Sequence, residues 1–416
     1  MSAGGRRPPV WLLGLCNFPL GAYFAVMLYT VPQMLASAGV PEPRIASVTA
    51  IGLIPSFCSF FLSPILDWRF TRRAYAVVLA FLTASALFAA LTALRELTLL
   101  TAFMFVGAAT VSLYQAALGG WVGSVVGPEK KGRLGAWLTV GNVAGGGLTA
   151  VIAIVVLRRL PFELGAALLA LLLLAPLPLF PWIPTPAPDR RLASESFREF
   201  FREVLSLLRR RTVVWTLFLF ALPAASFALT NTLSGLGRDF GTSEQMVGLV
   251  NGVGLTVAGI VGSLVVPRLI ARVSPRLLYL SIGTVGALFT LTLITLSRTK
   301  STFALAVLGE NAFQAAAFAV ESTIVLATIG EGNPLAATQF GLLIAAPSLP
   351  ITYMQAVDGA AYGLRGLSGA LVADAVLSLV ACAIAGLLFR QIQPNQVETG
   401  LRNAPSIAGP TELDTV

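Results

Sequence analysis

Two carboxylates stand inside an apolar stretch, residues 301–329, that is long enough to cross a lipid bilayer. A spanning helix needs roughly 20 apolar residues and a charge at its centre costs at least about 2.5 kcal/mol, so Glu310 and Glu321 occupy unfavourable positions. Their spacing puts them within roughly 20° of one helix face and about 16 Å apart in depth. Gln314 lies one turn beyond Glu310 on the same face. We predict that this face is a proton-coupling or substrate site directed toward a central cavity.

Neither acid has a cation at its own depth, because no Lys or Arg lies inside the apolar stretches. Each must meet water, a bound cation or a proton. The alternative is a structural role, in which the acid stays protonated and hydrogen-bonded between helices. A separation of about 16 Å is too wide for a catalytic carboxylate dyad. The sequence has no histidine, which removes Ser-His and Cys-His nucleophiles, histidine zinc sites and histidine-ligated haem. We therefore expect no enzyme activity, no metal site and no cofactor.

The elements that must position these acids are membrane helices. Apolar residues make up 56% of the chain and charged residues 11%, against roughly 25% charged in a soluble domain. The runs of alternating polarity that mark a membrane barrel are absent from the sequence. The sequence thus predicts an all-α membrane protein. Its twelve candidate spans lie near residues 10–34, 44–66, 74–94, 97–126, 134–157, 162–182, 212–236, 246–267, 277–297, 301–329, 336–357 and 367–389.

Lys and Arg residues are distributed unevenly among the loops between these spans. If the N-terminus is inside, 20 of the 28 basic residues fall on the cytoplasmic side and the other 8 on the opposite side. This bias predicts that both termini are cytoplasmic. The net charge of +9 is then a signal of topology, and we expect the lipid bilayer rather than nucleic acid as the partner.

A basic linker, residues 183–211, divides the chain near its middle. Six predicted spans precede it in residues 1–182 and six follow in residues 212–390, leaving residues 391–416 as a cytoplasmic tail that we expect to be disordered. Within the linker, a capping box at residues 196–199 begins a segment with apolar residues at helical spacing. This pattern predicts an amphipathic helix on the membrane surface or, alternatively, a partner-binding helix. Two bundles that rock around a midplane site need such a linker.

An acid at the predicted membrane edge, Asp67, stands beside a basic cluster in the loop SPILDWRFTRR between the second and third spans. Ser63 is small where helices must approach, and Asp67 can pair with Arg72 or Arg73 and so hold one conformation. The pattern resembles the cytoplasmic loop motif of the major facilitator superfamily, with a loop one residue longer than usual. The resemblance implies a gating role for Asp67, Arg72 and Arg73. A simple positive-inside anchor would explain the arginines but not the acid.

Four further motifs lie along the chain: residues 33–40 at the end of the first span, PEKKGRLGA at 128–136, Glu310-Asn311, and AATQFGLL at 336–343. Together with the Asp67 loop they resemble the AmpG-type muropeptide permeases and their acetyl-coenzyme A transporter relatives, over most of residues 11–390. The resemblance implies the major facilitator superfamily fold, with two pseudo-symmetric six-helix bundles. It also implies a monomeric, proton-coupled permease of the bacterial inner membrane.

The sequence departs from that family in its charged residues. Alignment on Trp121 places Gln115 and Gly119 where the family's fourth span carries acids, and residues 221–224 replace a Lys and an Asp of the seventh span. Uncharged polar residues remain on the spans that the resemblance places around the cavity, and as a set they suit a ligand rich in hydroxyl and amide groups. For each one alone, the alternative is an interhelical hydrogen bond worth about 0.6 kcal/mol. The substrate-binding candidates are Asn17, Tyr23, Tyr114, Gln115, Asn231 and Gln314.

Two classes of function remain open. The first is a secondary transporter of a small organic solute, since the sequence has no phosphate-binding loop for ATP. The resemblance implies a muropeptide, but no Arg or Lys within a span is available for its carboxylate. We therefore expect import of a cell-wall-derived sugar or glycopeptide whose neutral sugar portion is recognised better than its peptide acid. The alternatives are efflux or facilitated diffusion of another solute, and a non-transporting receptor or scaffold with the same fold.

The orientation can be tested by thiol labelling in a background without Cys16, Cys58 and Cys382. Because the charge bias places residues 183–211 inside, we expect Ala193→Cys to resist an impermeant thiol reagent in intact cells. Ser243→Cys, in a loop predicted to lie outside, should react. The reverse labelling pattern would contradict the orientation.

Overall fold

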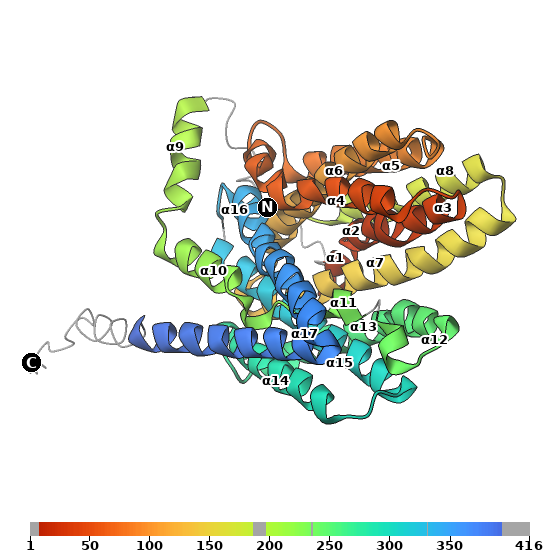
Figure 1. Ribbon diagram of the computed structural model, residues 1–416. Helices are drawn as coiled ribbons and strands as arrows, with labels where there is room; N and C mark the ends of the chain where they lie inside the picture. Colours follow the sequence, from red (N-terminus) through yellow and green to blue (C-terminus); the bar gives the residue numbers. More distant parts are fainter. Residues whose placement is uncertain (1–7, 186–196, 234–235, 331, 393–416) are drawn as a thin grey trace, which may run out of the picture.

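The computed structural model describes residues 8–185, 197–233, 236–330 and 332–392, and within these ranges every regular element is helical (Figure 1). The first half contains α1 (Val10–Leu15), α2 (Phe18–Ala25), α3 (Val31–Ser37), α4 (Glu42–Cys58), α5 (Arg72–Thr92), α6 (Leu97–Val125), α7 (Lys131–Arg159) and α8 (Phe162–Leu172). The second half contains α9 (Phe197–Leu207), α10 (Arg211–Ala221), α11 (Leu229–Leu233), α12 (Glu244–Leu249), α13 (Leu255–Ile270), α14 (Pro275–Thr295), α15 (Lys300–Ile329), α16 (Ala336–Ala345) and α17 (Ser348–Ile392).

Membrane-spanning segments dominate the described residues, as composition predicts. Ten helical segments are long and apolar enough to cross a bilayer, which confirms an all-helical membrane protein. The last of them, Ala336–Phe389, covers both of the final two predicted spans. The predicted seventh span contains only a shorter apolar helix, Arg211–Ala221. The number of twelve spans therefore stays a prediction.

The predicted seventh span is not a continuous helix. α10 ends at Ala221, and the short helix η7 (Pro223–Ala225) follows after Leu222, whose backbone is extended. Pro223 explains this geometry, because proline removes a backbone donor and disfavours helical geometry in the preceding residue. Phe227 then has a positive φ of 45° before α11 begins.

Side chains from other helices bind three carbonyl oxygens of this broken segment. In a bilayer such a break is tolerated only where surrounding protein satisfies the backbone. The donor and acceptor pairs are Tyr353 Oη to the Ala221 carbonyl at 2.9 Å, Cys382 Sγ to that of Ala224 at 3.2 Å, and Gln314 Nε2 to that of Phe227 at 3.2 Å. The break is thus built into the packing of α15 and α17.

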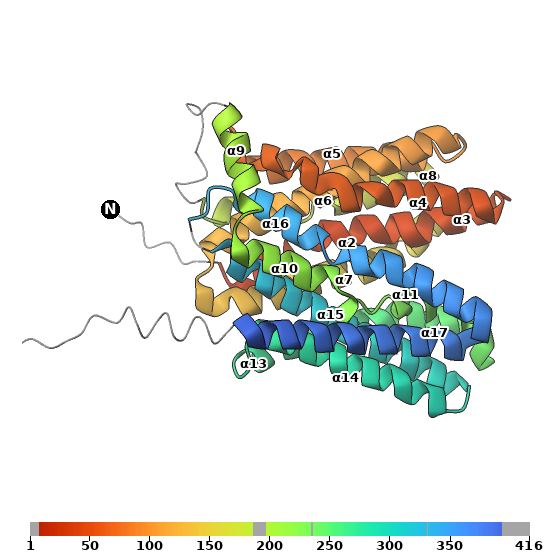
Figure 2. The same ribbon diagram turned by 60° about the vertical axis from the view of Figure 1, so that its left-hand side comes forward.

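α17 consists of two helical arms joined at Arg365 and Gly366, where the backbone leaves helical geometry. Figure 2 shows the second arm doubling back beside α14. Gly366 has φ 59° and ψ −155°, a conformation that is essentially restricted to glycine. The sharp reversal is therefore encoded at one residue.

Helices of the first half gather on one side of the molecule in Figure 1, and most helices of the second half on the other. α7 packs against α13 and α15, and α6 packs against α16, so these pairs join the halves. The predicted linker helix is present as α9, where Val204 and Leu207 pack on Trp68 and Leu335. The start of its capping box and residues 393–416 of the predicted tail lie outside the described residues.

The reversal of α17 can be tested with two glycines that differ only in backbone conformation. A Cβ would meet open space at both Gly366 and Gly363. We expect Gly366→Ala to destabilise the protein by about 1–3 kcal/mol because of backbone strain. Gly363→Ala, inside the first helical arm, should be neutral or stabilising by up to about 1 kcal/mol. Thermal unfolding in detergent measures both, and equal effects would contradict the proposed strain.

Candidate functional site

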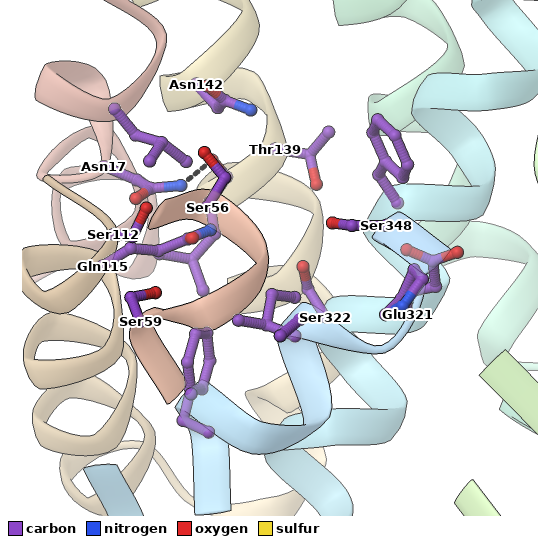
Figure 3. A pocket seen from close by; sticks show the side chains of 18 of the residues that line it. Asn17, Ser56, Ser59, Ser112, Gln115, Thr139, Asn142, Glu321, Ser322 and Ser348 are labelled. Atoms are coloured by element: carbon purple, nitrogen blue, oxygen red, sulfur yellow. Dashed lines mark hydrogen bonds between the residues drawn. The ribbon is translucent and has the colours of Figure 1, made fainter. Parts of the chain in front are cut away.

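A cavity of about 230 Å³ lies between the first and second halves of the chain. Figure 3 shows hydroxyl and amide side chains facing across it, with one carboxylate, Glu321. Three phenylalanines complete the lining together with aliphatic residues. The polar residues are Asn17, Ser56, Ser59, Ser112, Gln115, Thr139, Asn142, Glu321, Ser322 and Ser348.

Close helix packing positions the amides of the cavity. Asn17 lies in the turn between α1 and α2, where its Nδ2 donates a hydrogen bond to the Leu138 carbonyl at 3.0 Å. Its Oδ1 is buried and has no partner among the described residues. Gly21 lets α2 approach α7, since a Cβ there would lie 1.8 Å from the Asn142 carbonyl oxygen. The sequence thus places two amides from different helices at one wall.

The character of the lining limits the ligands that fit. Hydroxyl and amide groups supply hydrogen-bond donors and acceptors, while Phe24, Phe318 and Phe340 offer apolar surface. No Lys or Arg is among the described residues that line the cavity. This arrangement suits a small neutral or cationic solute with several hydroxyl groups.

Glu321 and Glu310 occupy one face of α15, as their spacing predicts, and each has a polar partner on α14. The hydroxyl of Tyr279 lies within hydrogen-bonding reach of Glu321, and the hydroxyl of Thr290 donates to Glu310 Oε1. The partners on α14 are also eleven residues apart, because the two helices run antiparallel. Only Glu321 reaches the cavity, so the prediction that both acids face it is wrong for Glu310.

Among the predicted substrate-binding residues, Asn17 and Gln115 line the cavity and four others do not. The hydroxyl groups of Tyr23 and Tyr114 donate to the carbonyls of Met104 and Cys16, each at 2.6 Å.

Tyr23 and Tyr114 thus form interhelical hydrogen bonds, which is the alternative to substrate binding that the sequence offered for each polar residue. Gln314 binds the broken segment instead, and Asn231 is exposed on α11. The six predicted substrate-binding residues therefore lie in three different places: the cavity, the core and the surface.

Sequence reasoning missed the serines of the cavity and two polar residues of α7. Serine in a membrane helix commonly bonds its own backbone, so its presence carries little signal. Asn142 was detectable, as an amide in the glycine-rich stretch of α7. The glycine at one of the family's acid positions has a structural reason, because a Cβ at Gly119 would lie 2.3 Å from the ring of Phe340.

Asp67, at the end of the short helix η3 (Ser63–Asp67), links the two halves of the chain at one end of the molecule. Its Oδ1 accepts hydrogen bonds from Arg72 Nε at 2.7 Å and from the Ala337 amide at 3.2 Å. Its Oδ2 accepts from the Thr338 amide and hydroxyl, both at 2.7 Å. A carboxylate of the first half thus caps the N-terminus of α16 in the second half, where the helix dipole favours an anion.

Cations of the first half bind carbonyl oxygens in the same region. Arg72 Nη2 donates to the carbonyls of Asn333 at 3.1 Å and Pro334 at 2.9 Å. Lys131 Nζ donates to the Leu326 carbonyl at 2.8 Å, near the C-terminus of α15, where the dipole favours a cation. This end, formed by residues 67–72, Lys131 and residues 326–330 and 332–338, is called the closed end below.

The family model described as Major Facilitator Superfamily matches residues 10–342. The chain belongs to this superfamily. The match confirms the superfamily resemblance, whereas the AmpG-type resemblance stays a prediction. No curated protein sequence matches the chain.

Solved structures of superfamily transporters share the fold at low sequence identity. The human organic anion transporter MFSD10 (TETRAN) is 18% identical with a TM-score of 0.66, and the match covers 91% of this chain and 100% of that one. The proton:xylose symporter XylE is 13% identical with a TM-score of 0.66, over 90% and 93% of the two chains. The transporter FucP in its outward conformation is 17% identical with a TM-score of 0.62, over 91% and 98%. At these identities the likeness establishes the fold alone.

The closed end offers a matched pair of arginines for a test. Arg72 is buried and paired with Asp67, whereas Arg73 is half-buried and makes no ion pair within the described ranges. We expect Arg72→Gln to destabilise the protein by about 3–5 kcal/mol, because it leaves the buried carboxylate uncompensated. Arg73→Gln should change stability by less than about 1 kcal/mol. Chemical denaturation in detergent compares the two, and equal losses would contradict the role given to Asp67.

Proposed function

We propose that the chain is a secondary transporter that moves a small hydroxyl-rich solute by alternating access. The observation that carries this proposal is a polar cavity built from both halves of the chain and sealed at one end by contacts between those halves. In the proposed mechanism, residues 1–182 and 212–390 form two six-helix bundles that rock about the cavity. Breaking the Asp67 cap on α16 opens the closed end, and its re-formation closes it.

The proposed topology places the closed end in the cytoplasm. It assigns twelve spans. Ala336–Phe389 contributes two of them, one before the reversal and one after it, and α10 and α11 together form another. The bias of basic residues supports this orientation. The protein then faces outward in this structure, in the inner membrane of a bacterium, as a monomer.

The solute class follows from the size and lining of the cavity. A volume of about 230 Å³ lies below the roughly 300–1,000 Å³ typical of sites for drug-sized ligands. Such a cavity suits a single sugar ring better than a disaccharide that carries a peptide. We propose a cell-wall-derived sugar as substrate, with Asn17, Gln115 and Asn142 as hydrogen-bonding partners. Fold neighbours described as xylose and fucose symporters are consistent with a sugar.

Coupling to protons is part of the same proposal. Glu321 lines the cavity and is the carboxylate placed to sense both solute and proton. Glu310, eleven residues away on the same face of α15, is the coupling group outside the cavity. A receptor or scaffold is the second class of function, and it predicts that no solute crosses the membrane.

Transport by the purified protein in proteoliposomes tests the substrate class. We expect uptake of a labelled amino sugar to exceed that of the cell-wall disaccharide, and uptake of the disaccharide with its peptide to be lowest. Gln115→Leu should raise KM by roughly 2- to 10-fold, because it removes one hydrogen bond from the cavity. Gln33→Leu makes the same change at an exposed position and should leave KM unaltered. Absence of flux with every sugar would overturn the sugar proposal, and absence of flux with other small organic solutes as well would favour the receptor or scaffold.

A further inference from the structure

Three carboxyl groups of the second half come together away from the cavity. Glu310 lies on α15, and Asp358 and Asp374 lie on the two arms of α17. The aspartates are each eight residues from Gly366, so the reversal of the chain brings both to a depth of about 12 Å from the turn. The exposed fractions of the three residues are 0%, 0% and 3%, respectively.

The oxygen atoms of this cluster are largely without partners. Thr290 donates to Glu310 Oε1, but Glu310 Oε2, both oxygens of Asp358 and Oδ1 of Asp374 are buried with no hydrogen bond within the described residues. A buried polar group is normally satisfied, and an unsatisfied one costs about 1–3 kcal/mol or more if charged. Oxygens left open in this way indicate that a ligand is required.

The charged groups that act on the cluster are acids. Asp374 and Asp358 both interact electrostatically with Glu310, and Asp374 interacts with Asp358.

Nearer the reversal, Asp239 accepts a hydrogen bond from Tyr362, and Arg298 binds the Ser368 hydroxyl at 3.2 Å. Arg365, at the reversal itself, is exposed. No basic side chain is among the groups found to act on Glu310 or Asp358 in the described residues.

Apolar packing keeps water from the cluster. Ala306 and Val307, one turn before Glu310, belong to a buried group that also contains Ala370 and Leu371, one turn before Asp374. Three ionised carboxylates cannot share such a site, because burial and like charge both oppose ionisation. The described residues contain no group of three His, Cys, Asp or Glu residues arranged to hold a metal ion.

We propose that Glu310, Asp358 and Asp374 form a proton-binding site that is separate from the solute cavity, in which the charge of each carboxyl group influences proton binding by the others. The inference rests on the proposed transport function for its physiological meaning, since it assigns the coupling proton to this cluster. The three acids lie on α15 and on both arms of α17, and α17 also binds the broken segment through Tyr353 and Cys382. A change in its protonation therefore acts on helices that line the cavity.

Infrared spectroscopy of the full chain in lipid nanodiscs tests proton binding without transport, through the C=O stretch of protonated carboxyl groups. We expect a band at pH 7 that disappears at alkaline pH and loses intensity in Asp358→Asn. The pH midpoint of the remaining band should fall by about one unit or more, because a like charge near Glu310 is gone. Asp374→Asn should behave in the same way. Glu163→Gln, which removes an exposed acid of α8, should leave band and midpoint unchanged.

Two outcomes overturn the inference: no band at pH 7, or a midpoint that neither aspartate substitution moves. A band lost at constant pH when choline chloride is replaced by sodium chloride would also overturn it, and would identify a sodium site. Accumulation of sugar under a proton gradient is measured separately, with Glu310→Gln expected to retain exchange but lose accumulation. If the band behaves as expected and no sugar moves in the wild type, the proton site stands and the transport proposal fails.

Discussion

The carboxylate of Asp67 joins the two halves of the chain through a charge placed on the end of a helix. It receives hydrogen bonds from two backbone amides of α16 and is neutralised by Arg72. The position is buried, so the loss of either partner leaves an uncompensated charge. In the proposed mechanism this contact closes one end of the cavity. Lys131 adds a second charge–helix interaction, in which a cation binds near the negative C-terminus of α15.

Many buried polar side chains among the described residues bind backbone carbonyls of neighbouring helices. Tyrosines of α2 and α6 bind carbonyls of neighbouring helices, and Gln314 binds the broken segment. Such bonds fix helix positions where the hydrophobic effect gives no directional preference. The residues that remain unsatisfied, among them Asn17 Oδ1 and the oxygens of Asp358, are then informative about ligands.

The class of the protein, most of its spans and the Asp67–Arg72 contact were predictable from sequence. Composition and the length of apolar runs determine the first two, and the loop motif indicates the third. A proline at residue 223 indicates a disturbed helix, but the depth of the break depends on donors from α15 and α17 that are remote in sequence. The cavity lining was less predictable still. Asn17 lines the cavity and Tyr23 does not, and this difference can be seen only when the helices that surround each residue are known. The reversal at Gly366 brings Asp358 and Asp374 to the same depth, where both act electrostatically on Glu310. The spacing of apolar residues does not reveal this reversal.

The matched spacing of polar pairs between α14 and α15 has a mechanical consequence. Thr290 with Glu310 and Tyr279 with Glu321 repeat at the same interval along both helices. If one helix slipped along its axis against the other, both pairs would separate together. We therefore expect α14 and α15 to move together along their axes, because a slip between them separates two polar pairs that lie three helical turns apart.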